Sequence, residues 1–145
     1  APMSTRSQKL RDIFNSLGPH SIHLLDKLYD PYAEFQDPVG RHVGLDDIRR
    51  YFEKAYKNVI SIHFHFHHEV ISGDEHVLTW TMKFQARGLK GGAPQSLDGV
   101  SIFRFQPDSD LVSYHRDYFD MGEMIYQHIP LLGPAVRLIR SQMQA

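Results

Sequence analysis

The sequence predicts an α+β domain in which N-terminal helices pack against a cone-shaped, curved antiparallel sheet. Two observations predict it. In the first third of the chain, apolar residues recur at spacings of three and four, which is typical of amphipathic helices. From residue 60 onward, long segments rich in β-branched and aromatic residues are separated by turn residues, which is typical of antiparallel strands. Helices followed by a run of strands favour the α+β class, and the absence of internal repeats indicates one domain over residues 1–145.

Three helices are expected before the sheet. The first covers residues 4–17 and ends at Gly18-Pro19, where glycine favours a C-terminal cap and proline removes a backbone donor. A short second helix over residues 20–28 is expected to end at Asp30-Pro31. The third helix, over residues 45–58, carries acidic residues in its first turn, where the helix dipole favours anions.

The remaining chain reads as strands and a final helix. The expected strands cover residues 32–36, 60–71, 76–87, 96–106 and 111–120. Turn residues separate the long strands, so consecutive strands are expected to pair as hairpins. A helix is expected over residues 121–127, and a C-terminal amphipathic helix is expected after Gly133-Pro134.

The composition excludes several classes of function. The chain has no cysteine, so disulfides, thiolate metal sites and a cysteine nucleophile are excluded. Its 16 basic and 17 acidic residues are well mixed, and no long basic run indicates nucleic acid as a partner. No apolar run reaches the roughly 20 residues that span a bilayer. We therefore expect a cytoplasmic protein with no membrane partner.

Three short motifs resemble a known superfamily. Phe-Gln-Asp-Pro-Val-Gly at residues 35–40 resembles the ketosteroid isomerase segment that carries the general-base aspartate, and Asp37 matches that residue. Ile-Phe-Arg-Phe at residues 102–105 resembles a strand of the same enzymes. Arg-Asp-Tyr-Phe-Asp at residues 116–120 resembles the C-terminal strand of limonene epoxide hydrolase, in which Asp117 matches a catalytic aspartate. The chain is thus similar to the nuclear transport factor 2-like superfamily, including its SnoaL-like and ketosteroid isomerase-like members.

The resemblance also shows where this chain differs. Ketosteroid isomerases pair their base with a tyrosine and a protonated aspartate, and those positions fall here on Phe14 and Ser101. The arginine and second aspartate of limonene epoxide hydrolase fall on Thr81 and Lys83. Because this fold hosts isomerases, cyclases, hydrolases and binding proteins, the resemblance leaves the reaction open.

The candidate catalytic residues are Asp37, Asp117 and His115. A carboxylate becomes a useful base near neutral pH when burial raises its pKa, and Asp37 is flanked by apolar residues. His115 and Asp117 share one strand face and form a workable acid/base pair. The expected ligand-binding residues are Phe14, Tyr32, Phe35, Ser101 and Phe119. The alternative is structural: a turn aspartate before proline, a histidine–aspartate hydrogen bond and a small strand serine.

A run of histidines marks the first long strand. His63, His65 and His67 are expected on one face, with Phe64, Phe66 and His68 on the other. Imidazoles two residues apart can hold Zn²⁺. We nevertheless predict no metal, and interpret these histidines as an exposed or dimer-facing sheet surface.

The sequence therefore predicts a cofactor-free enzyme that performs isomerisation, cyclisation or hydration on a small apolar, oxygenated molecule. Two alternatives are a module that binds a small apolar ligand without chemistry and a protein-interaction scaffold with a filled cone. A homodimer that forms through the sheet face is expected in each case, because long antiparallel strands leave one face to be covered.

Overall fold

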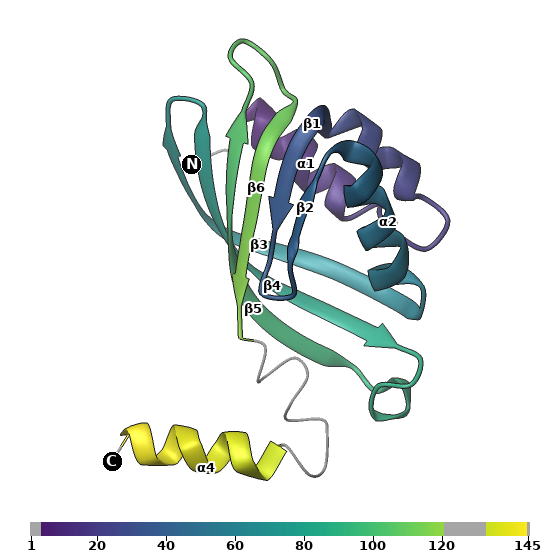
Figure 1. Cartoon of the computed structure of the whole chain (residues 1–145), viewed down its shortest axis with the longest axis vertical. Coiled ribbons are helices and arrows are strands. Elements are labelled where there is room, and N and C mark those ends of the chain that lie inside the picture. The colour runs from purple at the N-terminus through teal and green to yellow at the C-terminus, as the bar shows by residue number, and fades with distance from the viewer. Residues whose placement is uncertain (1–3, 121–132, 145) are drawn as a thin grey trace.

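The α+β prediction is confirmed in the computed structural model, which describes residues 4–120 and 133–144 (Figure 1). Six strands form one curved, open sheet in the order β2-β1-β6-β5-β4-β3. Helices α1 and α2 pack together against one face of this sheet. A space remains between α2 and the long strands, and it becomes the candidate site.

The elements follow the expected order. The helices are α1 (Thr5–Phe14), the 3₁₀ helices η1 (Ile22–Lys27) and η2 (Lys90–Gly92), α2 (Leu45–Tyr56) and α4 (Gly133–Gln144). The strands are β1 (Tyr29–Gln36), β2 (Arg41–Val43), β3 (Val59–Ser72), β4 (Glu75–Ala86), β5 (Gln95–Phe105) and β6 (Val112–Phe119). The expected helix over residues 121–127 lies outside the described residues. Among the described residues, no helix has the length and apolar character to cross a bilayer.

The sheet pairs mainly as consecutive hairpins. Strands β3, β4, β5 and β6 pair antiparallel in succession, whereas β1 runs parallel to β6 and pairs antiparallel with β2. The edge strand β3 is tied to the helical layer by Asn15, at the C-terminal end of α1. The Asn15 amide accepts from the backbone N–H of Phe64 at 2.8 Å and donates to its carbonyl at 3.2 Å. The Asn15 side chain thus makes the two hydrogen bonds that a neighbouring strand would make to Phe64, and it covers part of the exposed sheet edge.

Strand β1 differs from the prediction at its start. It begins at Tyr29 rather than at Tyr32, and it passes through Pro31, which was expected to lie in a break. The pairing of β1 with β6 shifts register between Tyr29 and Glu34. Proline is tolerated at such an irregularity because no ladder hydrogen bond is lost there. The short strand β2 carries no alternation that would have revealed it.

A bulge in β3 changes the expected faces of its histidines. Phe66 pairs with Trp80 and His68 with Thr79, so His67 is the additional residue. His63, His65 and His67 are exposed as expected, but the placement of His68 on the phenylalanine face is wrong, because it is exposed too. The same shift turns Glu69 toward α1, where it contacts Ser7.

Candidate functional site

An apolar cavity of about 250 Å³ lies between α2 and the concave face of the sheet. Most of its wall is aromatic and aliphatic, and its polar groups are few. A cavity of this kind is the usual form of a small-molecule site. The lining residues that carry the argument are Phe14, Phe35, Asp37, Tyr51, Tyr56, Trp80, Ser101, His115, Asp117 and Phe119.

A chain of four hydrogen bonds runs along one wall of the cavity. The Trp80 indole N–H donates to Ser101 Oγ at 2.8 Å, and the Ser101 hydroxyl donates to Asp117 Oδ1 at 2.5 Å. His115 Nε2 lies 2.6 Å from the same oxygen, and the Tyr29 hydroxyl lies 2.6 Å from His115 Nδ1. We call these five residues the cavity network.

The strand geometry explains how the cavity network assembles. His115 and Asp117 are two residues apart on β6, so both side chains face inward. Ser101 lies directly opposite Asp117 on the neighbouring strand β5. Gly99 lies opposite Trp80, and a Cβ at Gly99 would lie 2.2 Å from the indole ring. Glycine is therefore needed there so that the indole can lie across β5 and reach Ser101.

One assignment of protons satisfies every group in the cavity network. Burial, with the nearby Asp117 charge, raises the pKa of Tyr29 well above its ordinary value, so its hydroxyl remains protonated and donates to His115 Nδ1. The His115 Nε2–H then donates to Asp117. Asp117 Oδ1 accepts hydrogen bonds from both His115 and Ser101, while Oδ2 has no hydrogen-bond partner among the described residues. The side chain of Asp117 is 18% exposed, whereas His115 is 1% exposed. Asp117 thus lines the cavity and keeps one carboxylate oxygen without a partner among the described residues.

Asp37 lies in the same cavity but has both oxygens occupied. Its Oδ1 accepts from the backbone N–H groups of Val39 at 2.9 Å and Gly40 at 3.1 Å. Its Oδ2 accepts from the Tyr51 hydroxyl. Burial raises the pKa of Tyr51, and the hydrogen bond to Asp37 raises it further, so Tyr51 stays a donor. Asp37 therefore combines the predicted position in the cavity with the hydrogen bonds of the alternative, structural interpretation.

The structure brings seven of the eight predicted site residues to one cavity. Phe14, Phe35, Asp37, Ser101, His115, Asp117 and Phe119 all line it. Tyr32 does not, because it lies beside the irregular part of β1 and is 88% exposed. The prediction that His115, Asp117 and Phe119 share a face agrees with their common place in the cavity wall.

Sequence reasoning missed the polar roles of three aromatic residues. Tyr29, Tyr51 and Trp80 were not among the expected site residues, yet each donates a hydrogen bond to the site. The available signal was chemical, since a buried tyrosine or tryptophan usually finds a partner for its O–H or N–H. Within residues 4–120 and 133–144, no cluster of three histidine, aspartate or glutamate side chains is arranged to hold a metal ion.

The open sheet, the helices on its concave face and the aromatic cavity define a nuclear transport factor 2-like protein. The profile of the SnoaL-like domain matches residues 10–115. Since this match covers most of the chain, the protein belongs to the SnoaL-like domain family.

Solved structures support the same fold. A nuclear transport factor 2-like protein of unknown function from Burkholderia pseudomallei has a TM-score of 0.72 at 18% identity, over 88% of this chain and 99% of that one. A putative SnoaL-like polyketide cyclase from Shewanella putrefaciens has a TM-score of 0.71 at 20% identity, over 85% and 95%. A protein with a ketosteroid isomerase-like fold from Catenulispora acidiphila, solved with trimethylamine, has a TM-score of 0.74 at 12% identity, over 88% and 94%. No curated protein sequence gives a significant match.

Proposed function

We propose that the protein is an acid/base enzyme that moves a proton on a small, mainly apolar, oxygenated molecule. The reaction class is isomerisation, cyclisation or hydration. The observation that supports it is the carboxylate of Asp117, which has one oxygen fixed by His115 and Ser101 and the other free toward an apolar cavity. A fixed carboxylate with one open oxygen, in surroundings of low polarity, is suited to general-base catalysis.

In this proposal Asp117 Oδ2 accepts the proton from a carbon next to a carbonyl, or from a water molecule. The His115 and Ser101 hydrogen bonds hold the carboxylate in one orientation throughout. In an isomerisation, the same oxygen returns the proton to a different carbon of the substrate, so that no proton is gained or lost.

Tyr56 is the candidate donor to the substrate oxygen. Its side chain lines the cavity, and its hydroxyl has no hydrogen-bond partner among the residues that the structure describes. Burial raises the pKa of Tyr56, and the charge of Asp117 raises it further, so the hydroxyl stays protonated. It would fill the role for which the resemblance expected a hydroxyl at the position of Phe14.

The test is turnover of a panel that contains a ketosteroid, an epoxide and an aryl ketone. Asp117→Asn keeps an acceptor oxygen for Ser101 and His115 but removes the base, so kcat should fall by about 10²- to 10⁴-fold. The matched control is Asp98→Asn, which alters an exposed carboxylate bonded to Thr81 outside the cavity. Equal rates for wild type and Asp117→Asn would remove Asp117 from the chemistry.

One observation favours a second candidate, a binding module without chemistry. Asp37, the residue that the resemblance selects as the base, is held by three donors within its own turn and α2. A binding module predicts a ligand that co-purifies unchanged and stabilises the fold. It also predicts that neither the wild type nor Asp117→Asn forms any product, and that the substitution changes only the affinity for the ligand.

We also propose that the protein is a homodimer that pairs through the outer face of its sheet. The exposed side chains on this face include the histidines of β3 and Tyr118 of β6, which is 46% exposed. Sedimentation at micromolar concentration should give twice the monomer mass of 16.8 kDa. A monomer under these conditions would contradict the proposal.

A further inference from the structure

Four basic side chains belong to two segments of the chain that also line the cavity. Lys54 and Lys57 stand at the C-terminal end of α2, and Arg87 and Lys90 stand in the connection between β4 and β5. All four side chains are exposed. Each is a direct neighbour in the chain of a residue that lines the cavity, these being Ala55, Tyr56, Ala86 and Leu89. We call the four side chains the basic rim.

The two segments of the basic rim are joined to each other. The backbone N–H of Arg87 donates to the carbonyl of Asn58 at 2.8 Å. The Arg87 guanidinium donates to the carbonyl of Lys57 at 3.4 Å. The rim is therefore a defined edge made by the end of α2 and the end of β4, rather than four unrelated surface side chains.

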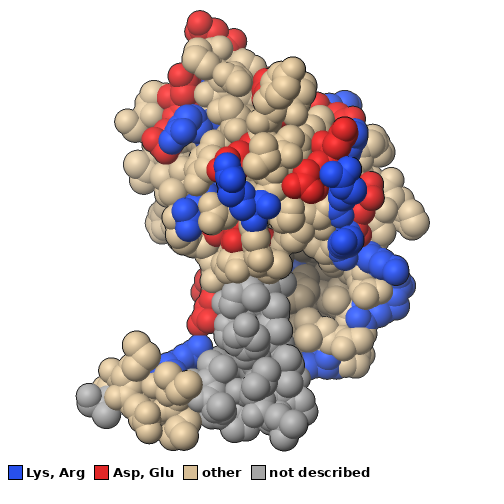
Figure 2. Space-filling view, in the orientation of Figure 1, with Lys and Arg blue, Asp and Glu red and all other residues tan. Residues whose placement is uncertain are grey.

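One acidic residue, Glu53, lies close to the basic rim, next to Lys54 and one helical turn before Lys57. No other aspartate or glutamate occurs in residues 53–68 or in residues 76–97. Within the described part of the chain, none of the four cations forms an ion pair, whereas Arg6, Lys9 and Arg49 elsewhere each do. Figure 2 shows the result on the lower right of the main body, where basic side chains gather without acidic ones.

Helix capping explains only half of this pattern. Cations near the C-terminus of α2 interact favourably with the helix dipole, which accounts for Lys54 and Lys57. It does not account for Arg87 and Lys90, which add like charge beside them. A cluster of one sign at the opening of a cleft attracts ligands of the opposite charge.

The interior of the cavity has the opposite character. Its lining contains two carboxylates, Asp37 and Asp117, and no lysine or arginine. An anionic group would be repelled there, while an apolar group would be accepted by the aromatic walls. The two parts of the site therefore select for different ends of one molecule.

We infer that the ligand is amphipathic, with an apolar body inside the cavity and an anionic head group, a carboxylate or a phosphate, at the basic rim. This inference rests on the proposal that the cavity is the substrate site. It requires only binding, so it can be tested independently of turnover.

Trp80 provides the measurement, because it is the only tryptophan and it borders the cavity. Its fluorescence should report titrations with octanoate, octyl phosphate, 1-octanol and octylammonium, which share one apolar chain. At low salt we expect both anions to bind about tenfold more tightly than 1-octanol, with octylammonium weakest. The advantage should shrink as salt is raised, because exposed charges are screened.

Variants of the basic rim separate its contribution to affinity from that of the apolar cavity. Lys57→Gln combined with Arg87→Gln should bring the anions to within about twofold of 1-octanol and leave the affinity for 1-octanol unchanged. Lys54→Gln combined with Lys90→Gln is an independent second pair, and far-UV circular dichroism confirms folding of each. The matched control is Lys27→Gln, which alters an exposed lysine on η1 that does not line the cavity.

Three results would overturn the inference: anions that bind no better than 1-octanol to the wild type, an anion preference that survives in both pairs of variants, or no binding of any probe. Asp117→Asn should keep the anion preference even if it abolishes turnover. A failure of the catalytic proposal is therefore distinguishable from a failure of this one.

Discussion

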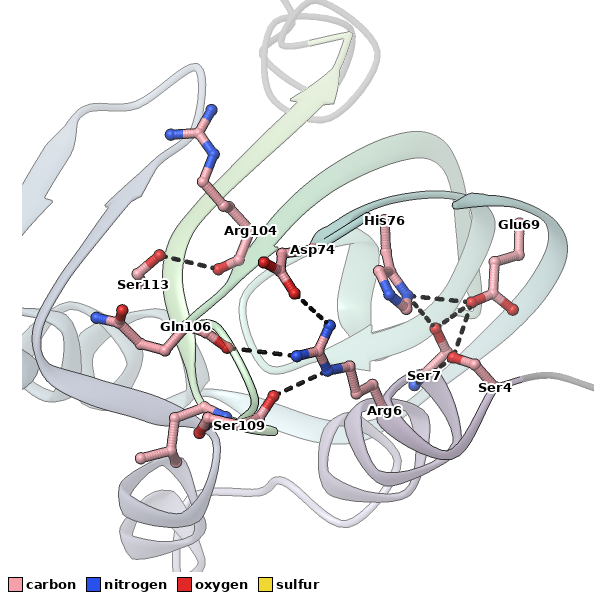
Figure 3. Close-up of polar contacts among 11 residues, drawn as sticks. Ser4, Arg6, Ser7, Glu69, Asp74, His76, Arg104, Gln106, Ser109 and Ser113 are labelled. Carbon is pink, nitrogen blue, oxygen red and sulfur yellow. Dashed lines mark hydrogen bonds and ion pairs between the residues drawn. The ribbon is translucent and has the colours of Figure 1, made fainter. Parts of the chain in front are cut away.

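Two clusters in this molecule combine a histidine, a carboxylate and hydroxyl groups, but they are set in different surroundings. One is the cavity network around His115 and Asp117. The other, drawn in Figure 3, contains Ser7, His76 and Glu69. In that cluster His76 Nδ1 lies 2.9 Å from Ser7 Oγ and 3.2 Å from Glu69 Oε1, and the Ser7 hydroxyl donates to the same carboxylate.

The second cluster lies beneath α1 and is largely buried. Ser7 is 0% exposed and His76 2% exposed, and neither residue lines the cavity. Its members come from α1, β3 and β4, so its hydrogen bonds hold the first helix on the sheet. Arg6 extends this attachment, since it donates to the Ser109 carbonyl at 2.8 Å and pairs with Asp74 at 3.0 Å.

Residue types alone therefore do not identify a site. Both clusters have the composition of an acid/base unit, and in both the hydrogen bonds fall on one carboxylate oxygen, but only Asp117 lines an apolar cavity. We therefore expect substitutions in the cavity network to affect activity and substitutions around Glu69 to affect stability.

The largest expected difference is in turnover. On a substrate that the wild type converts, Asp117→Asn should lower kcat by about 10²- to 10⁴-fold, because the base is lost. Glu69→Gln makes the same chemical change in the second cluster, which does not line the cavity, and should leave kcat within about twofold. Initial rates at saturating substrate measure both, and equal losses in the two variants would show that the clusters are not distinct in function.

The second difference is in the free energy of unfolding. Glu69→Ala should destabilise the protein by about 1–3 kcal/mol, because the Ser7 hydroxyl and the His76 ring lose a buried partner. Asp117→Ala should be less destabilising, because Asp117 lines the cavity and water that fills the place of its carboxylate can bond to Ser101 and His115. Urea unfolding followed by circular dichroism gives both values. A larger loss for Asp117→Ala would reverse the assignment of structural and functional roles.

A smaller effect is expected from the end of the cavity network. Tyr29→Phe removes the hydroxyl that donates to His115 Nδ1, so the ring is less firmly oriented. Loss of one such hydrogen bond should lower kcat by about tenfold with KM little changed. The matched control is Tyr114→Phe on β6, next to His115, because the Tyr114 ring contacts Arg104 and does not line the cavity. Similar losses in both variants would argue against a positioning role for Tyr29.

The smallest expected effect is the pH dependence of stability. Burial lowers the pKa of His76 below its ordinary value and Arg6 lowers it further, against the opposing charges of Glu69 and Asp74. The unfolded chain therefore binds this proton more tightly than the folded protein does. The neutral form of His76 therefore contributes to the free energy of unfolding. This contribution is fully present above the pKa of histidine in the unfolded chain, near 6.5, and is lost as the pH falls toward the lower pKa of the folded protein.

His76→Gln tests this contribution. The wild-type Tm should fall on going from pH 7.5 to 5.5, and His76→Gln should reduce that fall. The other histidines are common to both proteins, so the difference between them isolates His76. An identical pH dependence in the two proteins would contradict the expected direction.

The sequence was sufficient to predict most of the fold because its signals are local. Alternation and turn residues located the four long strands, and period-two spacing placed His115 and Asp117 on one face. It was insufficient where pairing decides the outcome. The bulge at His67, which turns Glu69 inward, depends on the register of β3 against β4. The path of β1 through Pro31 depends likewise on its pairing with β6.

The candidate site shows the same limit. The aspartates and the histidine could be selected from the sequence, but their relative roles could not. Whether Asp37 or Asp117 keeps a free oxygen depends on donors from the turn after β1, from α2 and from β5. The contact of Trp80 with Ser101 requires Gly99 opposite the indole, which becomes evident only once β4 and β5 are paired.

We expect a small apolar molecule to enter the space that the cavity network borders. The most direct measurement is the single indole N–H resonance of Trp80 in ¹⁵N-labelled protein during a titration with 1-octanol. Because this N–H donates a hydrogen bond to Ser101 beside the cavity, we expect the peak to shift until the binding saturates. A peak that stays unchanged up to the solubility limit of 1-octanol would contradict it.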